Sequence, residues 1–246
     1  MGPFPRIIAH RGSPRAAPEN TLASFRQAAT EGARFVEFDA ALTADNRVVV
    51  FHDDDLDRTS DGHGPLAETL FEPTQALDAG SWFAPAFKGE LIPTLEEALE
   101  LFAVLGLGFN IELKTDPGRE VQLAEVALPI AAACWPDHLP TPVISSFSRQ
   151  AVAAAKEILP AWPRAMLFDR LPGDWAEVGK SLGAISLNAN QKHLTREQVM
   201  EVRGRGFAVM AYTVNEPSRA ETLFGWGVDA IFTDIPGEML KKFGGK

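Results

Sequence analysis

The chain has one cysteine and fewer basic than acidic residues, and each shortage excludes a class of protein. Cys134 alone cannot form an intramolecular disulfide, so the sequence is not typical of a protein built for an oxidising compartment. The 246 residues carry 33 Asp and Glu against 23 Lys and Arg, a formal charge of -10. This balance argues against a broad basic surface for nucleic acid or anionic lipid. A phosphate ligand would therefore need local positive charge.

Long apolar runs are also missing. No uninterrupted stretch approaches the ~18 residues that a membrane-spanning helix needs, since Pro129 and Pro136 interrupt the alanine-rich segment near Cys134. Residues 1–6 lead almost at once into the apolar run 7–9, without the regions of a signal peptide. We therefore expect a cytoplasmic protein without a membrane span.

Short apolar runs alternate with helical patterns along most of the chain, which predicts a parallel sheet covered by helices. Eight runs qualify as parallel strands: 6–9, 35–42, 108–113, 142–147, 164–168, 184–187, 207–214 and 229–233. Eight is the number of strands that closes a (β/α)8 barrel, which commonly takes about 250 residues. The expected architecture is one α/β TIM-barrel domain over residues 1–246.

Two segments depart from the repeating pattern. Residues 47–51 follow the run 35–42 after a short turn, which predicts a hairpin that would bring His52 nearly opposite Asp39. Residues 53–90 are rich in Gly and Pro and contain several aromatics, which indicates an inserted lid or small subdomain. We expect its aromatics Trp82, Phe83 and Phe87 to pack a small core of their own, although one at its edge could contact a ligand.

Two helix starts are marked by capping residues. Thr94 and Glu97 form a capping box before an apolar periodic segment, and Thr21 is placed to cap the first helix. Glu19 and Asn20, just before that helix, could instead support a neighbouring functional loop.

Seven polar residues lie where apolar runs end, and burying them unpaired would be costly. They are His10, Arg11, Glu37, Asp39, His52, Glu112 and Lys114. Since ligand sites of such barrels form at the carboxyl ends of the strands, we expect these residues to form one site. Polar residues recur at other strand ends, at 145–147, 188, 213–215 and 233–234.

The types of these residues indicate phosphoester chemistry. Glu37, Asp39 and Glu112 offer hard oxygen ligands, which suit one Mg²⁺ or Ca²⁺ ion better than zinc. Arg11 and Lys114 would add positive charge for a phosphodiester anion.

Two histidines complete the expected site. Cleavage requires a proton to be removed from the attacking oxygen and another to be delivered to the leaving oxygen, and histidine does both near neutral pH. His10 and His52 are the predicted pair, with the order of their roles left open.

Each of these residues also has a purely structural explanation. A single histidine is more often a hydrogen-bonded structural residue, and Glu112 with Lys114 could be a plain ion pair. Glu37 and Asp39 could form the solvated face of a strand, but Phe35 shares their face and weakens that explanation.

The motifs that contain these residues resemble those of the glycerophosphodiester phosphodiesterases, nearly from end to end. The matching segments are His10-Arg-Gly, Pro18-Glu-Asn-Thr21, Glu37-Phe-Asp39, Val49-Val-Phe-His-Asp53, Asp57-Arg-Thr59, Ile92-Pro-Thr-Leu95, Glu112-Leu-Lys114, Ser145-Ser-Phe147, Tyr212-Thr-Val-Asn215 and Phe232-Thr-Asp234. A small departure is Tyr212, where many relatives carry tryptophan.

The resemblance implies hydrolysis of a small glycerophosphodiester, such as glycerophosphocholine or glycerophosphoethanolamine, to glycerol 3-phosphate and an alcohol. It also implies attack by the neighbouring glycerol hydroxyl and a cyclic phosphate that water then opens. Two alternatives stay open: a non-catalytic phosphoglycerol-binding protein, which could dispense with either histidine, and a lysophospholipase D-like enzyme whose insertion accommodates an acyl chain.

Overall fold

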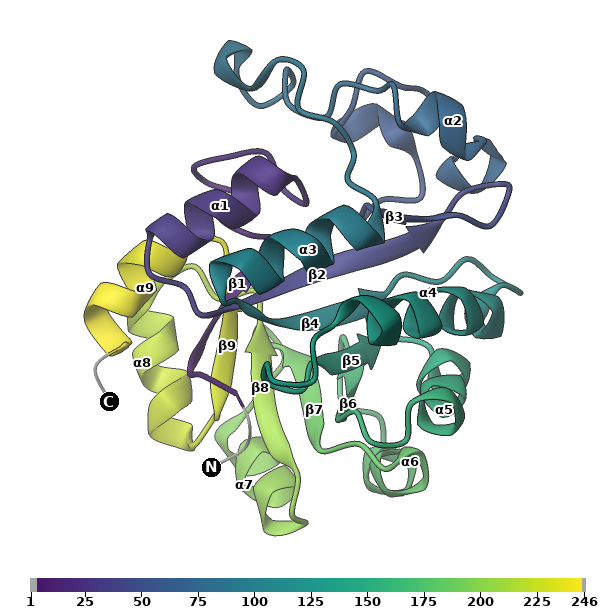
Figure 1. Ribbon diagram of the computed structural model, residues 1–246. Coiled ribbons are helices and arrows are strands. Elements are labelled where there is room, and N and C mark those ends of the chain that lie inside the picture. Colours follow the sequence, from purple (N-terminus) through teal and green to yellow (C-terminus); the bar gives the residue numbers. More distant parts are fainter. Residues whose placement is uncertain (1–3, 245–246) are drawn as a thin grey trace.

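Eight parallel strands close into a barrel in the computed structural model, which describes residues 4–244 (Figure 1). They are β1 (Ile7–His10), β2 (Phe35–Leu42), β4 (Gly108–Leu113), β5 (Val143–Ser146), β6 (Arg164–Phe168), β7 (Ser186–Asn190), β8 (Ala208–Tyr212) and β9 (Ala230–Thr233). Strand β1 closes the ring because it pairs with both β2 and β9. The predicted TIM barrel is confirmed. The expectation that residues 1–6 do not form a signal peptide falls partly on residues 1–3, which lie outside the described residues.

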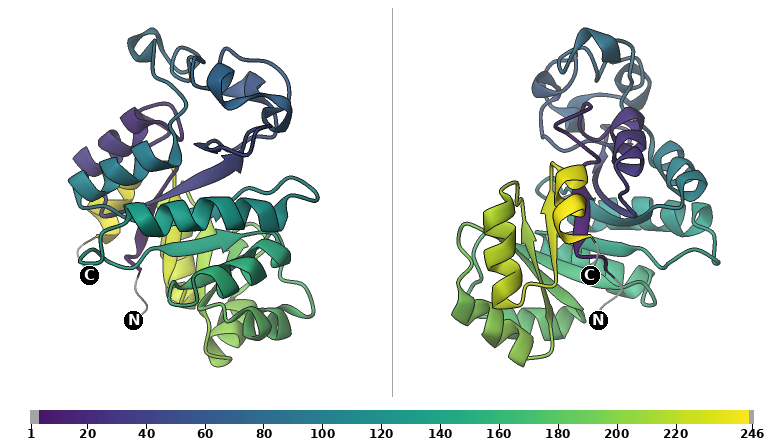
Figure 2. Two further views of the ribbon diagram at one scale, coloured as in Figure 1. Left: turned by 45° about the vertical axis from the view of Figure 1, so that its right-hand side comes forward. Right: turned by 90° about the vertical axis from the view of Figure 1, so that its left-hand side faces the viewer.

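Eight helices of the described chain surround the barrel (Figures 1 and 2). They are α1 (Leu22–Thr30), α3 (Leu95–Leu105), α4 (Glu120–Cys134), α5 (Arg149–Ile158), α6 (Trp175–Leu182), α7 (Arg196–Gly204), α8 (Pro217–Trp226) and α9 (Pro236–Phe243). Both predicted caps are present: Thr21 accepts a hydrogen bond from the backbone N–H of Ser24, and Thr94 and Glu97 form a reciprocal capping box. These caps fix where the loops above β1 and β3 end.

Helix α4 differs from expectation at one proline. Pro129 lies inside the helix, which continues to Cys134, so only Pro136 lies beyond its end. The partly buried helix tolerates the missing N–H because packing against the barrel holds its shape. Within residues 4–244, none of the helices combines the length and the apolar character needed to cross a bilayer.

The predicted hairpin is present. Strand β3 (Val48–Val50) runs antiparallel to β2, with Ala40 opposite Val50. The Phe51 N–H donates to the carbonyl oxygen of Asp39 at 3.0 Å, so His52 lies one residue beyond the partner of Asp39. The hairpin therefore carries His52 to the same end of the barrel as the acids of β2.

The chain between β3 and α3 stands above the barrel, on the side of α1 and α3 (Figures 1 and 2). It contains the short helix α2 (Phe71–Thr74) and single 3₁₀ turns at Leu56–Arg58, Leu66–Glu68 and Pro85–Phe87. A separate cluster of mostly aliphatic side chains, among them Leu56, Leu66 and Ile92, packs against the hairpin beneath.

The aromatics of this segment pack on one another. Trp82 and Phe87 each make an edge-to-face contact with Phe83, but all three lie outside the aliphatic cluster, and Trp82 is 39% exposed. The three aromatics thus pack on one another, as expected, but do not join the insertion's buried aliphatic cluster.

Candidate active site

The seven predicted residues meet at the carboxyl ends of the barrel strands. A cavity of about 330 Å³ opens there, and every one of them except Asp39 lines it. Asp39 is fully buried beside it, two positions after the cavity residue Glu37 on β2. The strand register explains the convergence, since β2 lies between β1 and β4 and its residues Glu37 and Asp39 pair with Asn110 and Glu112.

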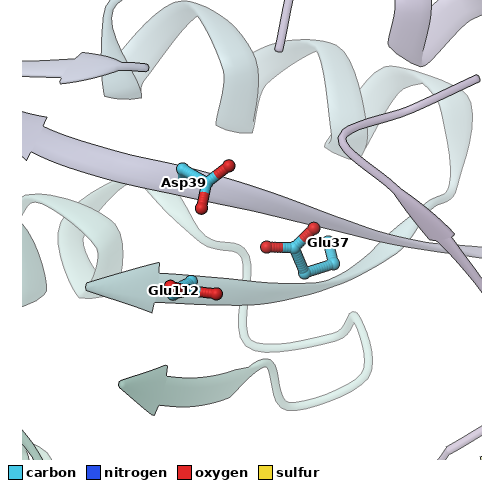
Figure 3. A group of neighbouring side chains, drawn as sticks. All are labelled: Glu37, Asp39 and Glu112. Atoms are coloured by element: carbon cyan, nitrogen blue, oxygen red, sulfur yellow. The ribbon is translucent and has the colours of Figure 1, made fainter. Parts of the chain in front are cut away.

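Glu37, Asp39 and Glu112 place one carboxylate oxygen each within 4.8 Å of one another (Figure 3). Glu37 Oε1 and Asp39 Oδ1 are buried and have no hydrogen-bond partner in the described chain. Buried acceptors without partners are rare, and hard oxygen donors in such a group suit a divalent cation. The residues present therefore fit one such ion.

The ionisation of these three acids reflects their crowding. Burial, with the negative charge of Asp39, raises the pKa of Glu112 to about 7 and that of Glu37 well above its usual range. Burial alone would also raise the pKa of Asp39, but the positive charges of Arg11 and Lys114 lower it. Asn20 contributes too, because its amide donates to Asp39 Oδ2 at 2.8 Å. The possible supporting role of Asn20 thus has a definite contact.

Arg11 reaches the acids through an unusual backbone. It has a φ of 53°, in the left-handed region, and Gly12 follows at 90°. A Cβ on Gly12 would lie 2.3 Å from Ser24 Oγ, so only glycine fits. In this conformation Arg11 Nε lies 3.1 Å from Asp39 Oδ2 and Nη1 donates to Glu19 at 2.7 Å. Strain of this kind is typical of binding sites.

Lys114 lies at the opposite side of the acids, just beyond β4. Its Nζ is 3.4 Å from Glu112 Oε1 and 3.3 Å from His52 Nε2. Despite its burial, the pKa of Lys114 is raised, because Glu112 and Asp39 stabilise the charged form. Arg11 and Lys114 therefore keep positive charge on two sides of the cavity.

Each histidine is held by a carboxylate at Nδ1. His10 contacts Asp234 at 2.7 Å, and the Asn215 amide donates to the same carboxylate at 2.6 Å. His52 contacts Asp53 at 2.5 Å. In both rings this arrangement orients Nε2 for a second partner, as in other histidine–carboxylate pairs.

The surroundings of His52 favour its neutral form. Burial is the main cause that lowers the pKa of His52, and the positive charges of Arg11 and Lys114 lower it further. The carboxylate of Asp39 has the opposite effect, but a smaller one than burial. Asp53 itself keeps a lowered pKa, because hydrogen bonds from Arg58 and His52 outweigh its burial.

Apolar side chains form another part of the cavity wall. Phe147 and Tyr212 pack edge to face at 5.8 Å between ring centres, and the Tyr212 hydroxyl donates to the Phe168 carbonyl at 2.7 Å. Lys114 Nζ lies 6.0 Å from the centre of the Phe147 ring. The cavity thus offers charged groups and an aromatic surface next to each other.

Sequence reasoning missed several cavity residues and misplaced one. Asn188 is fully buried inside the barrel, where its Oδ1 accepts from Ser186, because β7 continues to Asn190. Asn190 and the next two residues, Gln191 and Lys192, line the cavity instead. Their position at the end of a strand was the available signal, but the expected strand 184–187 stops three residues before the observed end of β7 at Asn190.

The carboxyl end of this TIM barrel holds three clustered carboxylates, the positively charged side chains of Arg11 and Lys114, and two oriented histidines. This set of groups is typical of a phosphoesterase site. Comparison with known proteins gives the same class. Residues 10–238 match the model of the glycerophosphoryl diester phosphodiesterase family. The chain belongs to this family, and it is an enzyme.

Individual relatives cover nearly all of the chain. It is 36% identical over 239 residues to YhdW of Bacillus subtilis, with 96% of both chains covered. It is 33% identical to a glycerophosphodiester phosphodiesterase of Caldanaerobacter subterraneus, with 95% of this chain and 96% of the relative covered. Among solved structures, a phosphodiesterase of Oleispira antarctica in complex with the product sn-glycerol-3-phosphate has a TM-score of 0.95 and 37% identity, covering 98% of this chain and 97% of that one.

Proposed function

We propose that the enzyme hydrolyses glycerophosphodiesters to glycerol 3-phosphate and an alcohol, with one Mg²⁺ or Ca²⁺ ion held by Glu37, Asp39 and Glu112. The observation that carries this proposal is the cluster of these three carboxylates beside a cavity that Arg11 and Lys114 line. The relative from Oleispira antarctica, which binds sn-glycerol-3-phosphate as its product, supports the same substrate class.

The cation fits the site because it would satisfy the unpartnered oxygens of Glu37 and Asp39 and relieve the repulsion among the three carboxylates. When bound, it would neutralise negative charge on a phosphate oxygen and make phosphorus more electrophilic. Arg11 and Lys114 hold the same anion from either side, and the Phe147 and Tyr212 rings provide a surface for the carbon chain of glycerol.

We assign the first proton transfers to different histidines. His52 Nε2 removes the proton of the glycerol hydroxyl as its oxygen forms a bond to phosphorus, since the lowered pKa of His52 keeps the ring neutral. His10 donates a proton to the alcohol oxygen as its bond to phosphorus breaks. His10 lies between Glu37 and Asp234, with Nε2 3.9 Å from Glu37 Oε2 and Nδ1 2.7 Å from Asp234 Oδ1, and these contacts hold the ring in position.

The product of this step is a cyclic phosphate. His10, now without its second proton, removes a proton from water, whose oxygen attacks phosphorus. His52 returns its proton to the glycerol oxygen as the ring opens. Each histidine thus ends in its starting state, and glycerol 3-phosphate remains in the cavity.

The two alternatives receive less support. A phosphoglycerol-binding protein would not need a carboxylate behind each histidine, yet Asp234 and Asp53 hold both rings. An acyl chain, as in a lysophospholipase D-like reaction, would need an apolar surface near the insertion. The cavity between the insertion and the barrel is instead lined by charged side chains beside Trp82 and Phe83.

The test is release of glycerol 3-phosphate from a panel of glycerophosphodiesters, with Mg²⁺, with Ca²⁺ and with a chelator. We expect release that depends on the cation and that falls by about 10²- to 10⁴-fold in His10→Ala and in His52→Ala. His63→Ala is the matched control, because the His63 side chain is 84% exposed on the insertion. Cation-dependent binding of glycerol 3-phosphate by the wild type without release from any diester would favour the binding protein.

A further inference from the structure

A second cavity, of about 260 Å³, adjoins the first and shares His10 and Arg11 with it. One of its walls is the loop after β1, with Pro14 and Arg15. The insertion provides the facing wall. The two cavities therefore meet at the group that the proposed function places beside the leaving oxygen.

Trp82 and Phe83 are the aromatic part of that facing wall. The indole N–H of Trp82 donates to the Ala79 carbonyl at 2.8 Å, and the two rings pack edge to face at 5.7 Å. The rings are thus held in place although the aliphatic cluster of the insertion lies elsewhere. A fixed, 39% exposed indole beside a cavity is a ready surface for an apolar face of a ligand.

The position of this cavity matches one arm of a diester. In an in-line displacement the leaving oxygen departs on the side of phosphorus opposite to the attacking oxygen. If glycerol occupies the first cavity, against Phe147 and Tyr212, the other arm must pass His10. The second cavity begins there.

The charges around the second cavity disfavour a cationic alcohol. Glu19 is already paired with both Arg11 and Arg58, and Asp234 is paired with His10. Arg15 takes part in none of the ion pairs found among residues 4–244. The lining therefore has positive charge in excess.

We propose that Trp82 and Phe83 form the binding surface for the departing alcohol and that this cavity selects a polyol, uncharged or anionic, over a quaternary ammonium alcohol. The C–H face of a polyol packs on the indole, and its hydroxyls hydrogen-bond to Arg15 and to the oxygens of Glu19. The inference rests on the proposed function and adds to it the class of alcohol released. Residues 53–90 then act as a subdomain that sets specificity.

The competing position for a cationic alcohol lies on the other side of Arg58. An open groove there is lined by His52, Lys114 and a run of acids that includes Asp54 and Asp55. An alcohol that left through this groove would not touch Trp82. The two positions therefore predict different responses to the same substitution.

The experiment compares kcat/KM for three diesters of glycerol phosphate, whose alcohols are inositol, choline and methanol. We expect the wild type to prefer the inositol diester to the choline diester. Trp82→Ala should lower kcat/KM for the inositol diester about 3- to 10-fold, the range for loss of one aromatic contact, and leave the methanol diester unchanged. Trp82→Phe should retain most of the activity, and Leu70→Ala, a truncation of another exposed side chain of the insertion, should change nothing.

Equal losses for the inositol and methanol diesters would show that Trp82 only supports the fold, and would overturn the proposal. A preference for the choline diester that Trp82→Ala leaves intact, but that Asp54→Asn reduces, would place the alcohol in the acidic groove instead. If the wild type cleaves none of the three diesters, the proposed function itself fails, and the inference fails with it.

Discussion

The two regions that border the site are built differently. The barrel contributes buried groups at strand ends, and Glu37 and Asp39 are only 2% and 0% exposed. The insertion contributes side chains from loops, such as Arg58 and Trp82, which are partly open to solvent. A strand holds a group within tenths of an ångström, whereas a loop can change without disturbing the sheet. We infer that the barrel holds the reacting groups and that the insertion determines which alcohol is accepted.

The largest expected effect comes from removing one charge of the barrel cluster. Glu112→Gln should lower activity at least about 100-fold, because one of the three proposed cation ligands is lost. The same change should leave the cation-free protein equally stable or more stable, since it relieves repulsion from Asp39, which helps to raise the pKa of Glu112 to about 7. Thermal unfolding with and without Mg²⁺ checks both points. A wild-type-like rise in Tm with Mg²⁺ in this variant would contradict the ligand role.

The histidine–aspartate pairs of the two regions offer a matched comparison. Asp234 holds His10 at 2.7 Å in the barrel, and Asp57 holds His63 at 2.8 Å on the insertion. Asp234→Asn should lower kcat about 10- to 100-fold, because the ring of His10 loses its orienting partner. Asp57→Asn should leave kcat within about 2-fold, because this pair is exposed to solvent and neither residue lines the main cavity. Equal effects on kcat would remove the distinction between the regions.

Two glycines with similar backbone angles compare how the barrel and the insertion tolerate a substitution, measured by the free energy of unfolding. Gly12 beside the barrel site has a φ of 90°, and Gly64 on the insertion has a φ of 82°. Alanine at Gly64 meets no atom within 4 Å, so only backbone strain of about 1 kcal/mol is expected. Alanine at Gly12 would also collide with Ser24, so we expect a loss of about 2–4 kcal/mol in the free energy of unfolding. Denaturant unfolding of both variants measures the contrast, and equal losses would contradict it.

The smallest expected effect is a displacement of the pH profile. The pKa of His52 is lowered from the ordinary histidine value of 6.5, mainly by burial. The ring therefore stays neutral until the pH falls below 6.5. Protonation below that point removes the proposed base. The acidic limb of kcat/KM against pH should therefore lie below pH 6.5. A limb above pH 6.5 would assign that limb to another group.

Much of the fold could be predicted because its signals are local. The strand runs, the hairpin turn after β2 and the capping box at Thr94 each depend on residues close together in the chain. The meeting of the seven candidate residues was also predictable, since the carboxyl ends of parallel barrel strands lie together and the hairpin brings His52 to the same end. The end of β7 and the separation of the insertion's aromatics from its aliphatic cluster were not, because both depend on contacts between residues far apart in the chain, such as the pairing of Asn190 with Tyr212. The expected cytoplasmic location stays a prediction.

The sequence by itself determined the barrel and the acids and histidines at its strand ends. The reason is that apolar runs alternating with helical patterns, and polar residues at the ends of those runs, can be recognised within short segments. Only the tertiary structure decided the partners of those residues. It brings Asp234 to His10 across 224 positions, leaves oxygens of Glu37 and Asp39 without partners, and places Trp82 beside the second cavity. The physical reason is that ionisation, strain and selectivity depend on distances between residues far apart in the chain, and these distances exist only once the barrel has closed.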